Sequence, residues 1–385
     1  MKSTKCLYRN WSKCNDEFSQ EHVLPQSIGG NIKLSNPFVL SNVCANCNSL
    51  AGLYVDGPYI RTWFTQSDKS RFALKYLDIE SKSIVPLRFI GVLSDYKYKD
   101  KICEVWGGPT GDTIFHFHTP YPSEPNKPSY IGVPPLLRKE IIDYGFTFLF
   151  VRSNNPLWYP VIFNSFAYHF NNSVNYLGNG LTPNGGGFKD IPSNLEKLKN
   201  ELKDKLRREL VVGFSFDHGF DTRFLAKSAL GFGALLLKKE FENGDFANRL
   251  RQLMWEKDYE KRAQIPVKGS GFLTKERVLE PEKSKVFLWP GGHFISVIKH
   301  DNEIYLHMIL YEERTATIQI SNEPDLLDCN NDSGYYYVVV PSLQRAVGPK
   351  KLNTYYEHKA GYKDKDLENL ENEMIRFKNL PPFEI

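Results

Sequence analysis

Four cysteines that could bind a metal ion lie near the start of this chain of 385 residues: Cys6, Cys14, Cys44 and Cys47. They account for four of the chain's six cysteines. In a reducing compartment, closely spaced cysteines are more often metal ligands than disulfide partners, and four thiolates suit a tetrahedral structural Zn²⁺. The CxxC pair has the usual spacing of a zinc knuckle, whereas seven residues separate the first two cysteines. We therefore predict a structural zinc site with all four thiols as ligands; the alternatives are a partial site or none.

Glu21, His22 and Asn48 could form a second metal site with a catalytic role. Carboxylate and amide oxygens are hard ligands that suit Mg²⁺ or Mn²⁺. A neutral imidazole beside such a metal can take a proton from an attacking water. The cation would stabilise the charge on a scissile phosphate and on the leaving 3′ oxygen. One base and one metal therefore suffice for hydrolysis of a phosphodiester.

The local sequence predicts two strands and a helix that would position these residues. An apolar stretch from Val23 leads to a turn at Gly29-Gly30, and the segment FVLSNV can form a short strand that runs into the CxxC pair. The stretch from Cys47 to Tyr59 is typical of helix and turn. The predicted order is strand, turn, strand, helix, which is a ββα unit that would bring His22 and Asn48 to a common point.

Together these residues resemble the HNH (ββα-metal) endonucleases, in particular the subgroup with zinc knuckles. The shared pattern is EHxxP, a following GG, then CxxCN and a nearby G and D, here Glu21, His22, Pro25, Gly29-Gly30, Cys44, Cys47, Asn48, Gly52 and Asp56. The resemblance covers about residues 3–60. It implies that His22 is the general base and that Glu21 and Asn48 bind the catalytic metal.

The chain departs from the family's pattern at two points. Many members have aspartate where this chain has Glu21, and the longer side chain would shift the metal or act through a water. The resemblance also implies a further asparagine that positions the His22 loop. Asn36 and Asn42 are both available, and neither has the commonest spacing to Asn48. We favour Asn36.

Length and patterning predict a mixed α+β protein of more than one domain. We expect a zinc-stabilised HNH domain over residues 1–80 and a larger α+β domain over residues 81–385, with a candidate internal seam near 172–190. In the larger region, period-2 patterning predicts strands at 84–93, 102–106, 114–118, 146–163 and 291–320. Amphipathic or apolar periodicity predicts helices at 192–210, 219–241, 246–264 and 365–380.

Two histidines, His116 and His118, lie on one face of the strand predicted at 114–118. Histidines at this spacing can share a metal ion. Because no acidic or thiol partner lies near them, the pattern favours a packed strand face.

Composition places few limits on the partners. The net charge of +4 permits a polyanionic partner without requiring one. The residues that could contact phosphates are Lys203, Lys205, Arg207, Arg208, Lys238 and Lys239, although such charges on helices more commonly form a solvated face. The N-terminus lacks the apolar run of a secretory signal, and Lys227 interrupts the longest apolar stretch, so we expect a cytoplasmic protein without a membrane partner.

These features predict a metal-dependent HNH endonuclease that acts on DNA, with RNA left open as a substrate. The arrangement resembles bacterial defence effectors in which an HNH domain is fused to a recognition domain, so a bacterial or phage nuclease of the defence or restriction type is expected. One alternative is a zinc-knuckle module that binds nucleic acid without catalysis, with Glu21-His22 capping a turn. Another is a sensor in which residues 81–385 bind a small molecule or a partner protein and control the nuclease.

Overall fold

The chain folds into two compact units of mixed α+β structure. The computed structural model describes residues 5–9, 17–77, 84–94, 98–119, 132, 145–179, 187–213, 219–272, 285–329, 333–375 and 377. Residues 1–60 and 216–379 belong to the first unit, and residues 61–215 and 380–385 belong to the second. The first unit therefore ends at residue 60 and not at the expected residue 80, because the N-terminal motif packs with the segment that begins at residue 216, after 155 intervening residues. The assignment of catalysis to residues 1–80 and of recognition to residues 81–385 stays a prediction.

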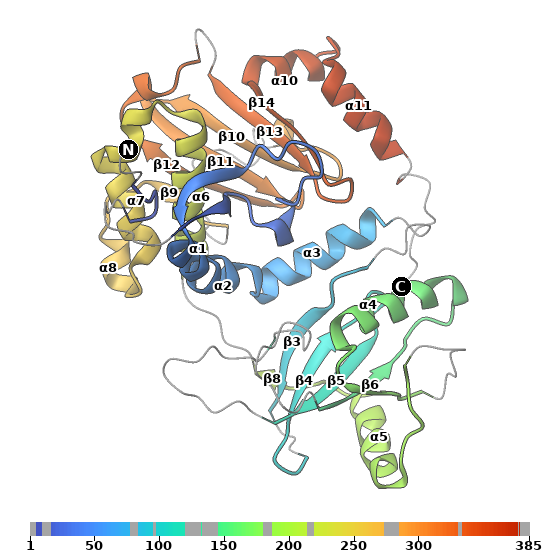
Figure 1. Cartoon of the computed structure of the whole chain (residues 1–385). Coiled ribbons are helices and arrows are strands. Elements are labelled where there is room, and N and C mark those ends of the chain that lie inside the picture. The colour runs from blue at the N-terminus through green and yellow to red at the C-terminus, as the bar shows by residue number, and fades with distance from the viewer. Residues whose placement is uncertain are drawn as a thin grey trace. The chain divides into compact units, whose positions relative to one another are not determined.

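The predicted ββα unit is present at the start of the first unit (Figure 1). Strand β1 (Phe18–His22) pairs antiparallel with β2 (Val39–Cys44), and helix α1 (Ala45–Ala51) begins directly after β2. A π-helical turn, η2 (Gly52–Asp56), continues α1 into α2 (Gly57–Ile60). The strand and helix expectations for this segment are confirmed.

The loop between β1 and β2 requires glycine at one position. A Cβ atom on Gly30 would lie 1.7 Å from the carbonyl oxygen of Leu24, so no other residue fits there without moving the backbone. Gly29, with a φ of 110°, ends the short 3₁₀ helix η1 (Gln26–Ile28) in the left-handed region. The Gly-Gly pair thus sets the path by which the chain leaves the end of β1.

The first unit also contains a six-stranded antiparallel sheet with the strand order β14-β13-β10-β11-β12-β9 (Figure 1). Its strands are β9 (Gly269–Ser270), β10 (His293–His300), β11 (Glu303–Leu310), β12 (Arg314–Ser321), β13 (Gly334–Val340) and β14 (Arg345–Lys351). Two helices follow the sheet, α10 (Leu352–Lys359) and α11 (Lys365–Met374). The predicted strands at 291–320 are confirmed in this region, and the final predicted helix is confirmed over Lys365–Met374. Residues 376 and 378–380 of that prediction lie outside the described residues.

Helix α6 (Phe220–Leu236) joins the sheet to the ββα unit. It packs against β12 on the sheet and against η2 and α2 of the N-terminal motif. Helices α7 (Asp245–Trp255) and α8 (Tyr259–Ala263) occupy the segment where one helix is predicted. They are separate because the chain is extended at Glu256 and Asp258, and the Asp258 carboxylate caps α8.

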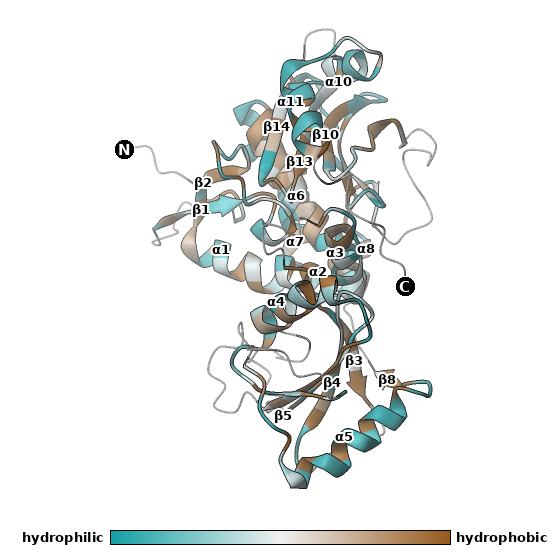
Figure 2. Ribbon diagram, turned by 90° about the vertical axis from the view of Figure 1, so that its right-hand side faces the viewer, coloured by the Kyte–Doolittle hydropathy of each residue, from teal (hydrophilic) through white to brown (hydrophobic). Residues whose placement is uncertain are grey.

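The second unit is built around a sheet with the strand order β7-β6-β5-β4-β3-β8. Its strands are β3 (Arg88–Leu93), β4 (Ile102–Gly107), β5 (Thr113–His118), β6 (Phe146–Phe150), β7 (Val174–Leu177) and β8 (Val212–Gly213), and its longer helices are α3 (Trp63–Lys75), α4 (Tyr159–Phe170) and α5 (Ser193–Lys205). All neighbouring strands are antiparallel except β6 and β7. The strands β3, β4 and β5 are largely hydrophobic, and α5 presents both hydrophobic and hydrophilic residues (Figure 2).

The two faces of this sheet pack against different helices. Leu195, Leu198 and Leu202 of α5 join one core cluster with phenylalanines of β5 and β6. Residues of α4 join a second cluster with Trp106 and Ile114. The sheet is therefore buried on both faces, which explains its near-continuous apolar strands.

The sequence predicted strands over residues 146–163, and this prediction is wrong for the second half of the segment. Only Phe146–Phe150 is a strand, and Asn155 and Pro156 then start a 3₁₀ turn that leads into α4. The Asn155 side chain accepts a hydrogen bond from the amide of Leu157, and proline fits the first turn of a helix because it lacks an amide hydrogen. Within the candidate seam at 172–190, Val174–Leu177 is a strand of the sheet, and residues 180–186 lie outside the described residues.

None of the helices in the described part of the chain has both the length and the apolar character that crossing a bilayer requires.

Candidate functional site

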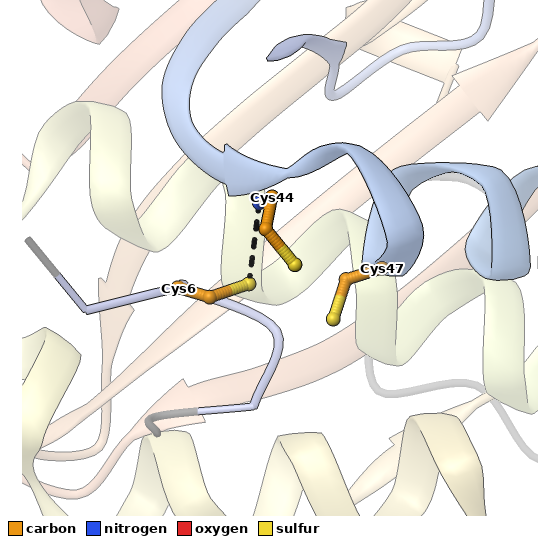
Figure 3. A group of neighbouring side chains, drawn as sticks. All are labelled: Cys6, Cys44 and Cys47. Atoms are coloured by element: carbon orange, nitrogen blue, oxygen red, sulfur yellow. Dashed lines mark hydrogen bonds between the residues drawn. The ribbon is translucent and has the colours of Figure 1, made fainter. Parts of the chain in front are cut away.

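Three of the four predicted zinc ligands converge in the first unit (Figure 3). The sulfur atoms of Cys6, Cys44 and Cys47 all lie within 4.8 Å of one another, and the three residues are fully buried. They come from the segment before β1, the end of β2 and the first turn of α1. Cys14 lies outside the described residues. A buried set of three thiols suits a soft or borderline divalent metal ion, so the cluster is a candidate metal site.

The sulfur atoms of this cluster interact with one another. The hydrogen bond from Cys47 and those from the backbone lower the pKa of the Cys6 thiol to about 5, despite its burial. The same contact with Cys6, together with burial, raises the pKa of Cys47. The backbone amide of Cys44 also donates to the Cys6 sulfur, at 3.5 Å. These contacts favour the thiolate form of Cys6, which is the form that binds metals.

Glu21 points into the protein, where a lysine from a distant helix binds it. Its Oε1 atom lies 2.7 Å from Nζ of Lys227 on α6 and also accepts a hydrogen bond of 2.7 Å from the Tyr8 hydroxyl. The same ammonium group lies 2.8 Å from Oδ2 of Asp56 and donates to the carbonyl oxygen of His22, at 3.3 Å. Glu21 and Lys227 are 2% and 1% exposed, so this is a buried ion pair.

Burial and charge together determine the protonation of this group. Burial alone lowers the pKa of Lys227, but the carboxylates of Asp56 and Glu21 raise it more, so the ammonium form is favoured. Burial raises the pKa of Asp56, and Lys227 opposes that shift. Burial and the negative charge of Glu21 raise the pKa of Tyr8, which keeps its hydroxyl protonated as a donor. Lys227 thus pairs with two carboxylates in the interior, and its single positive charge balances one of them.

Sequence reasoning did not include Lys227 and Tyr8 in the site. The available signal was the lysine that interrupts the apolar stretch from Phe224 to Leu237. A single charged residue within a helix that is otherwise apolar must be paired when it is buried.

His22 lies at the end of β1 and is half-buried. Its Nε2 atom lies 3.1 Å from the side-chain amide nitrogen of Gln26. Because an amide nitrogen donates, Nε2 of the neutral ring accepts and the ring proton lies on Nδ1. His22 therefore presents the form of imidazole that can take up a proton.

Asn48 connects helix α1 to strand β1. Its amide nitrogen donates to the hydroxyl of Ser19 and to the carbonyl oxygen of Gln20, both at 3.0 Å. Its Oδ1 atom accepts no hydrogen bond from the described residues, and the same holds for Oε2 of Glu21. Carboxylate and amide oxygens are hard ligands of the kind that Mg²⁺ prefers, and the binding of a second metal by Glu21 and Asn48 stays a prediction.

Of the two candidate asparagines, Asn36 is the one that bonds the loop after His22. Its amide nitrogen donates to the carbonyl oxygen of Gly30 at 2.7 Å, and its Oδ1 atom accepts from the amide of Phe38 at 3.0 Å. Asn42 instead donates to the Glu242 carboxylate at 3.3 Å. The predicted role of Asn36 in positioning this loop stays a prediction that these contacts support.

Side chains from later parts of the first unit form further hydrogen bonds with the backbone of the N-terminal motif. The Arg251 side chain donates to the carbonyl oxygen of Leu7 at 2.6 Å, and the indole of Trp255 donates to that of Tyr8 at 3.0 Å. Buried His293 bonds the carbonyl oxygen of Ile28 at 2.9 Å, and burial lowers the pKa of this histidine to about 4. His293 is therefore neutral, and these contacts make the motif part of a larger core.

Comparison with known families identifies the class of this site. Residues 6–64 match the family model described as HNH endonuclease. The match spans the ββα unit, the cysteine cluster and the Glu21-His22 pair, and the N-terminal segment is an HNH domain. A nuclease-type function follows from this family in general. No curated protein and no solved structure gives a significant match to the chain.

Proposed function

We propose that this protein is a metal-dependent endonuclease that hydrolyses phosphodiester bonds in DNA. The observation that carries the proposal is the match of residues 6–64 to the HNH endonucleases. His22 on β1 and Asn48 on α1 are the residues that we propose for the chemistry. A nucleic-acid substrate follows from the family, and DNA is the proposed choice.

His22 acts as the general base in this proposal. Its Nε2 lone pair, which accepts from Gln26 in the substrate-free protein, would take the proton from the attacking water once that water replaces the Gln26 amide as its partner. Oδ1 of Asn48 and Oε2 of Glu21 would hold Mg²⁺ or Mn²⁺, which when bound stabilises negative charge on a phosphate. Tyr8 and Lys227 fix the other oxygen of Glu21 and so orient this carboxylate. Asn36 holds the loop that follows His22.

The cysteine cluster has a structural role in this proposal. Zn²⁺ held by Cys6, Cys44 and Cys47, with Cys14 as the fourth ligand, would join the segment before β1 to the junction of β2 and α1. This junction positions Asn48, one residue after the last thiol. The metal would thus stabilise the geometry of the catalytic residues without taking part in the reaction.

The remaining residues would supply affinity or control. Exposed basic side chains at the end of α5 and after it, Lys203, Arg207 and Arg208, could contact DNA phosphates. We propose a cytoplasmic defence or restriction role, supported by the fusion of an HNH domain to a large α+β region, and a regulatory ligand or partner protein for that region.

Incubation of the purified protein with supercoiled plasmid tests the proposed activity. We expect nicked or linear DNA in the presence of Mg²⁺ or Mn²⁺, because the cation is needed at the scissile phosphate. Excess EDTA should abolish cleavage, and added Mg²⁺ should restore it. A parallel incubation with single-stranded RNA distinguishes the substrates. Cleavage of RNA with intact plasmid would overturn the choice of DNA, and equal cleavage with and without EDTA would overturn the metal-dependent mechanism.

Serine substitutions separate the proposed structural metal from the catalytic one. Cys44→Ser or Cys47→Ser should lose about one equivalent of zinc per chain and unfold the ββα unit, because a structural zinc site contributes folding free energy. Elemental analysis and hydrogen exchange measure the two effects. Asn48→Ala should keep the zinc and lose cleavage.

The buried thiol of Cys103 in the second unit provides the matched control for these substitutions. Cys103→Ser should keep the zinc content of the wild type. Wild-type zinc content in both Cys44→Ser and Cys47→Ser would rule out the cysteine cluster as the metal site.

A further inference from the structure

A second cluster of metal-ligating side chains lies in the second unit, away from the HNH motif in the sequence. Glu104 on β4 pairs in register with His116 on β5, and His118 lies two residues further along the same face of β5. One ligand atom from each residue lies within 4.8 Å of those of the other two. Their exposed fractions are 0%, 0% and 2%. The expectation that no acidic partner lies near the two histidines is therefore wrong, because the partner is on the neighbouring strand of the hairpin.

The hydrogen bonding of His118 leaves one of its ring nitrogens facing Glu104. Its Nδ1 atom lies 3.0 Å from the carbonyl oxygen of Thr119, and a carbonyl only accepts, so Nδ1 carries a proton. In the neutral ring Nε2 is then an acceptor. This Nε2 atom is buried, makes no hydrogen bond, and lies 3.1 Å from Oε1 of Glu104. Two acceptors at this distance repel one another unless the ring is protonated or a metal ion binds both atoms.

The surrounding groups hold all three side chains in place. The indole nitrogen of Trp106 donates to Oε2 of Glu104 at 3.0 Å, and the amide of Gly132 donates to Oε1 at 2.9 Å. Nδ1 of His116 bonds the hydroxyl of Thr147 at 3.0 Å. Metal-bound histidines usually have such a partner on the ring nitrogen that does not face the metal, because the bond fixes the orientation of the ring.

We propose that Glu104, His116 and His118 bind a divalent transition-metal ion, with Zn²⁺ as the ion that this ligand set fits best. Two imidazole nitrogens and one carboxylate oxygen are a common three-ligand set for zinc, with the fourth position left to a water. The ion would replace the repulsion between Nε2 of His118 and Oε1 of Glu104 with attraction to both. It would join β4 to β5 in the interior of the second unit, independently of the cysteine cluster.

Zinc content and X-ray absorption of the full-length wild-type protein test this site without any substitution. The proposal predicts imidazole scattering around zinc, which thiol ligands cannot produce. If the cysteine cluster is also filled, sulfur scattering should accompany it and the content should be about two equivalents per chain. Zinc without imidazole scattering, or protein that binds no zinc after incubation with Zn²⁺, would overturn the proposal. These readouts do not depend on nuclease activity.

Two substitutions assign the scattering to these residues. His118→Gln and Glu104→Gln should each lose about one equivalent of zinc relative to the wild type. His300→Gln, at a half-exposed histidine of β10, should lose none. If one variant fails to fold, the zinc content of the other variant and the wild-type X-ray absorption spectrum still test the proposal. Wild-type zinc content in a folded His118→Gln or Glu104→Gln variant would show that Glu104 and His118 form only a buried ion pair.

Discussion

His22→Ala should reduce plasmid cleavage by about 10²–10⁴-fold, the usual contribution of a general base. The lone pair on Nε2 of His22 is the proposed acceptor of the water proton, and alanine provides no group that could replace it. The His22 side chain is half-buried, and within the described part of the chain its one side-chain hydrogen bond is with Gln26, so the substitution should leave folding nearly unchanged. Cleavage rates at saturating Mg²⁺ and Mn²⁺ and DNA affinity by fluorescence anisotropy measure the two effects.

A surface histidine provides the control for this experiment. His300→Ala removes a half-exposed imidazole at the end of β10 and should cleave at the wild-type rate. DNA affinity should be similar in both variants, because neither change removes a phosphate contact that we propose. A wild-type cleavage rate in His22→Ala would refute the assignment of the base, whereas loss of folded protein would point to a structural role for this histidine.

Lys227→Met should lower the free energy of unfolding by about 3–5 kcal/mol, as is usual when one partner of a buried ion pair is removed. Methionine keeps much of the side-chain volume but leaves the carboxylates of Glu21 and Asp56 without their cation. Urea unfolding followed by circular dichroism measures the change. A divalent cation should restore part of the lost stability, because the two carboxylates then offer it an anionic site.

Two further variants separate the loss of charge from the loss of packing. Adding Glu21→Gln and Asp56→Asn to Lys227→Met removes the unpaired charges and should recover much of the stability. Lys239→Met breaks an exposed pair with Glu242 and should cost at most about 1 kcal/mol. If Lys227→Met is as stable as the Lys239→Met control, the ion pair does not hold Glu21 in place.

Local signals in the sequence were sufficient to predict the HNH motif. The spacing of Glu21-His22, the Gly-Gly pair and the CxxCN segment predicted the ββα unit, and the match to the HNH family agrees with it. Gly30 illustrates why such a motif can be recognised locally, since its requirement for glycine comes from the backbone only six residues earlier. The predicted hairpin at 102–118 rests on similar local patterning.

Contacts between distant residues could not be predicted in the same way. Lys227 appeared only as an interruption of an apolar helix, because nothing local indicates that its ammonium group meets Glu21 and Asp56. Glu104 and the two histidines come together only once the register of β4 and β5 is known. Residues 146–163 were assigned wrongly because aromatic and β-branched residues favour strands and the periodicity of a short apolar run does not distinguish a buried strand from a buried helix. Only Asn155-Pro156 marks the start of the helical segment.

The discontinuity of the first unit has a consequence for synthesis of the protein on the ribosome. His22 and its bonding partner Lys227 lie 205 positions apart, so the HNH motif emerges long before the helix that neutralises Glu21. At about 5–20 residues per second, this interval lasts about 10–40 s. During that time the nascent chain carries the motif without Lys227, Arg251 and His293, which fix it in the folded protein. Premature termination before Lys227 should therefore release fragments in which no lysine pairs with the carboxylates and no His293 bonds the loop after His22. We expect such fragments to be inactive as nucleases.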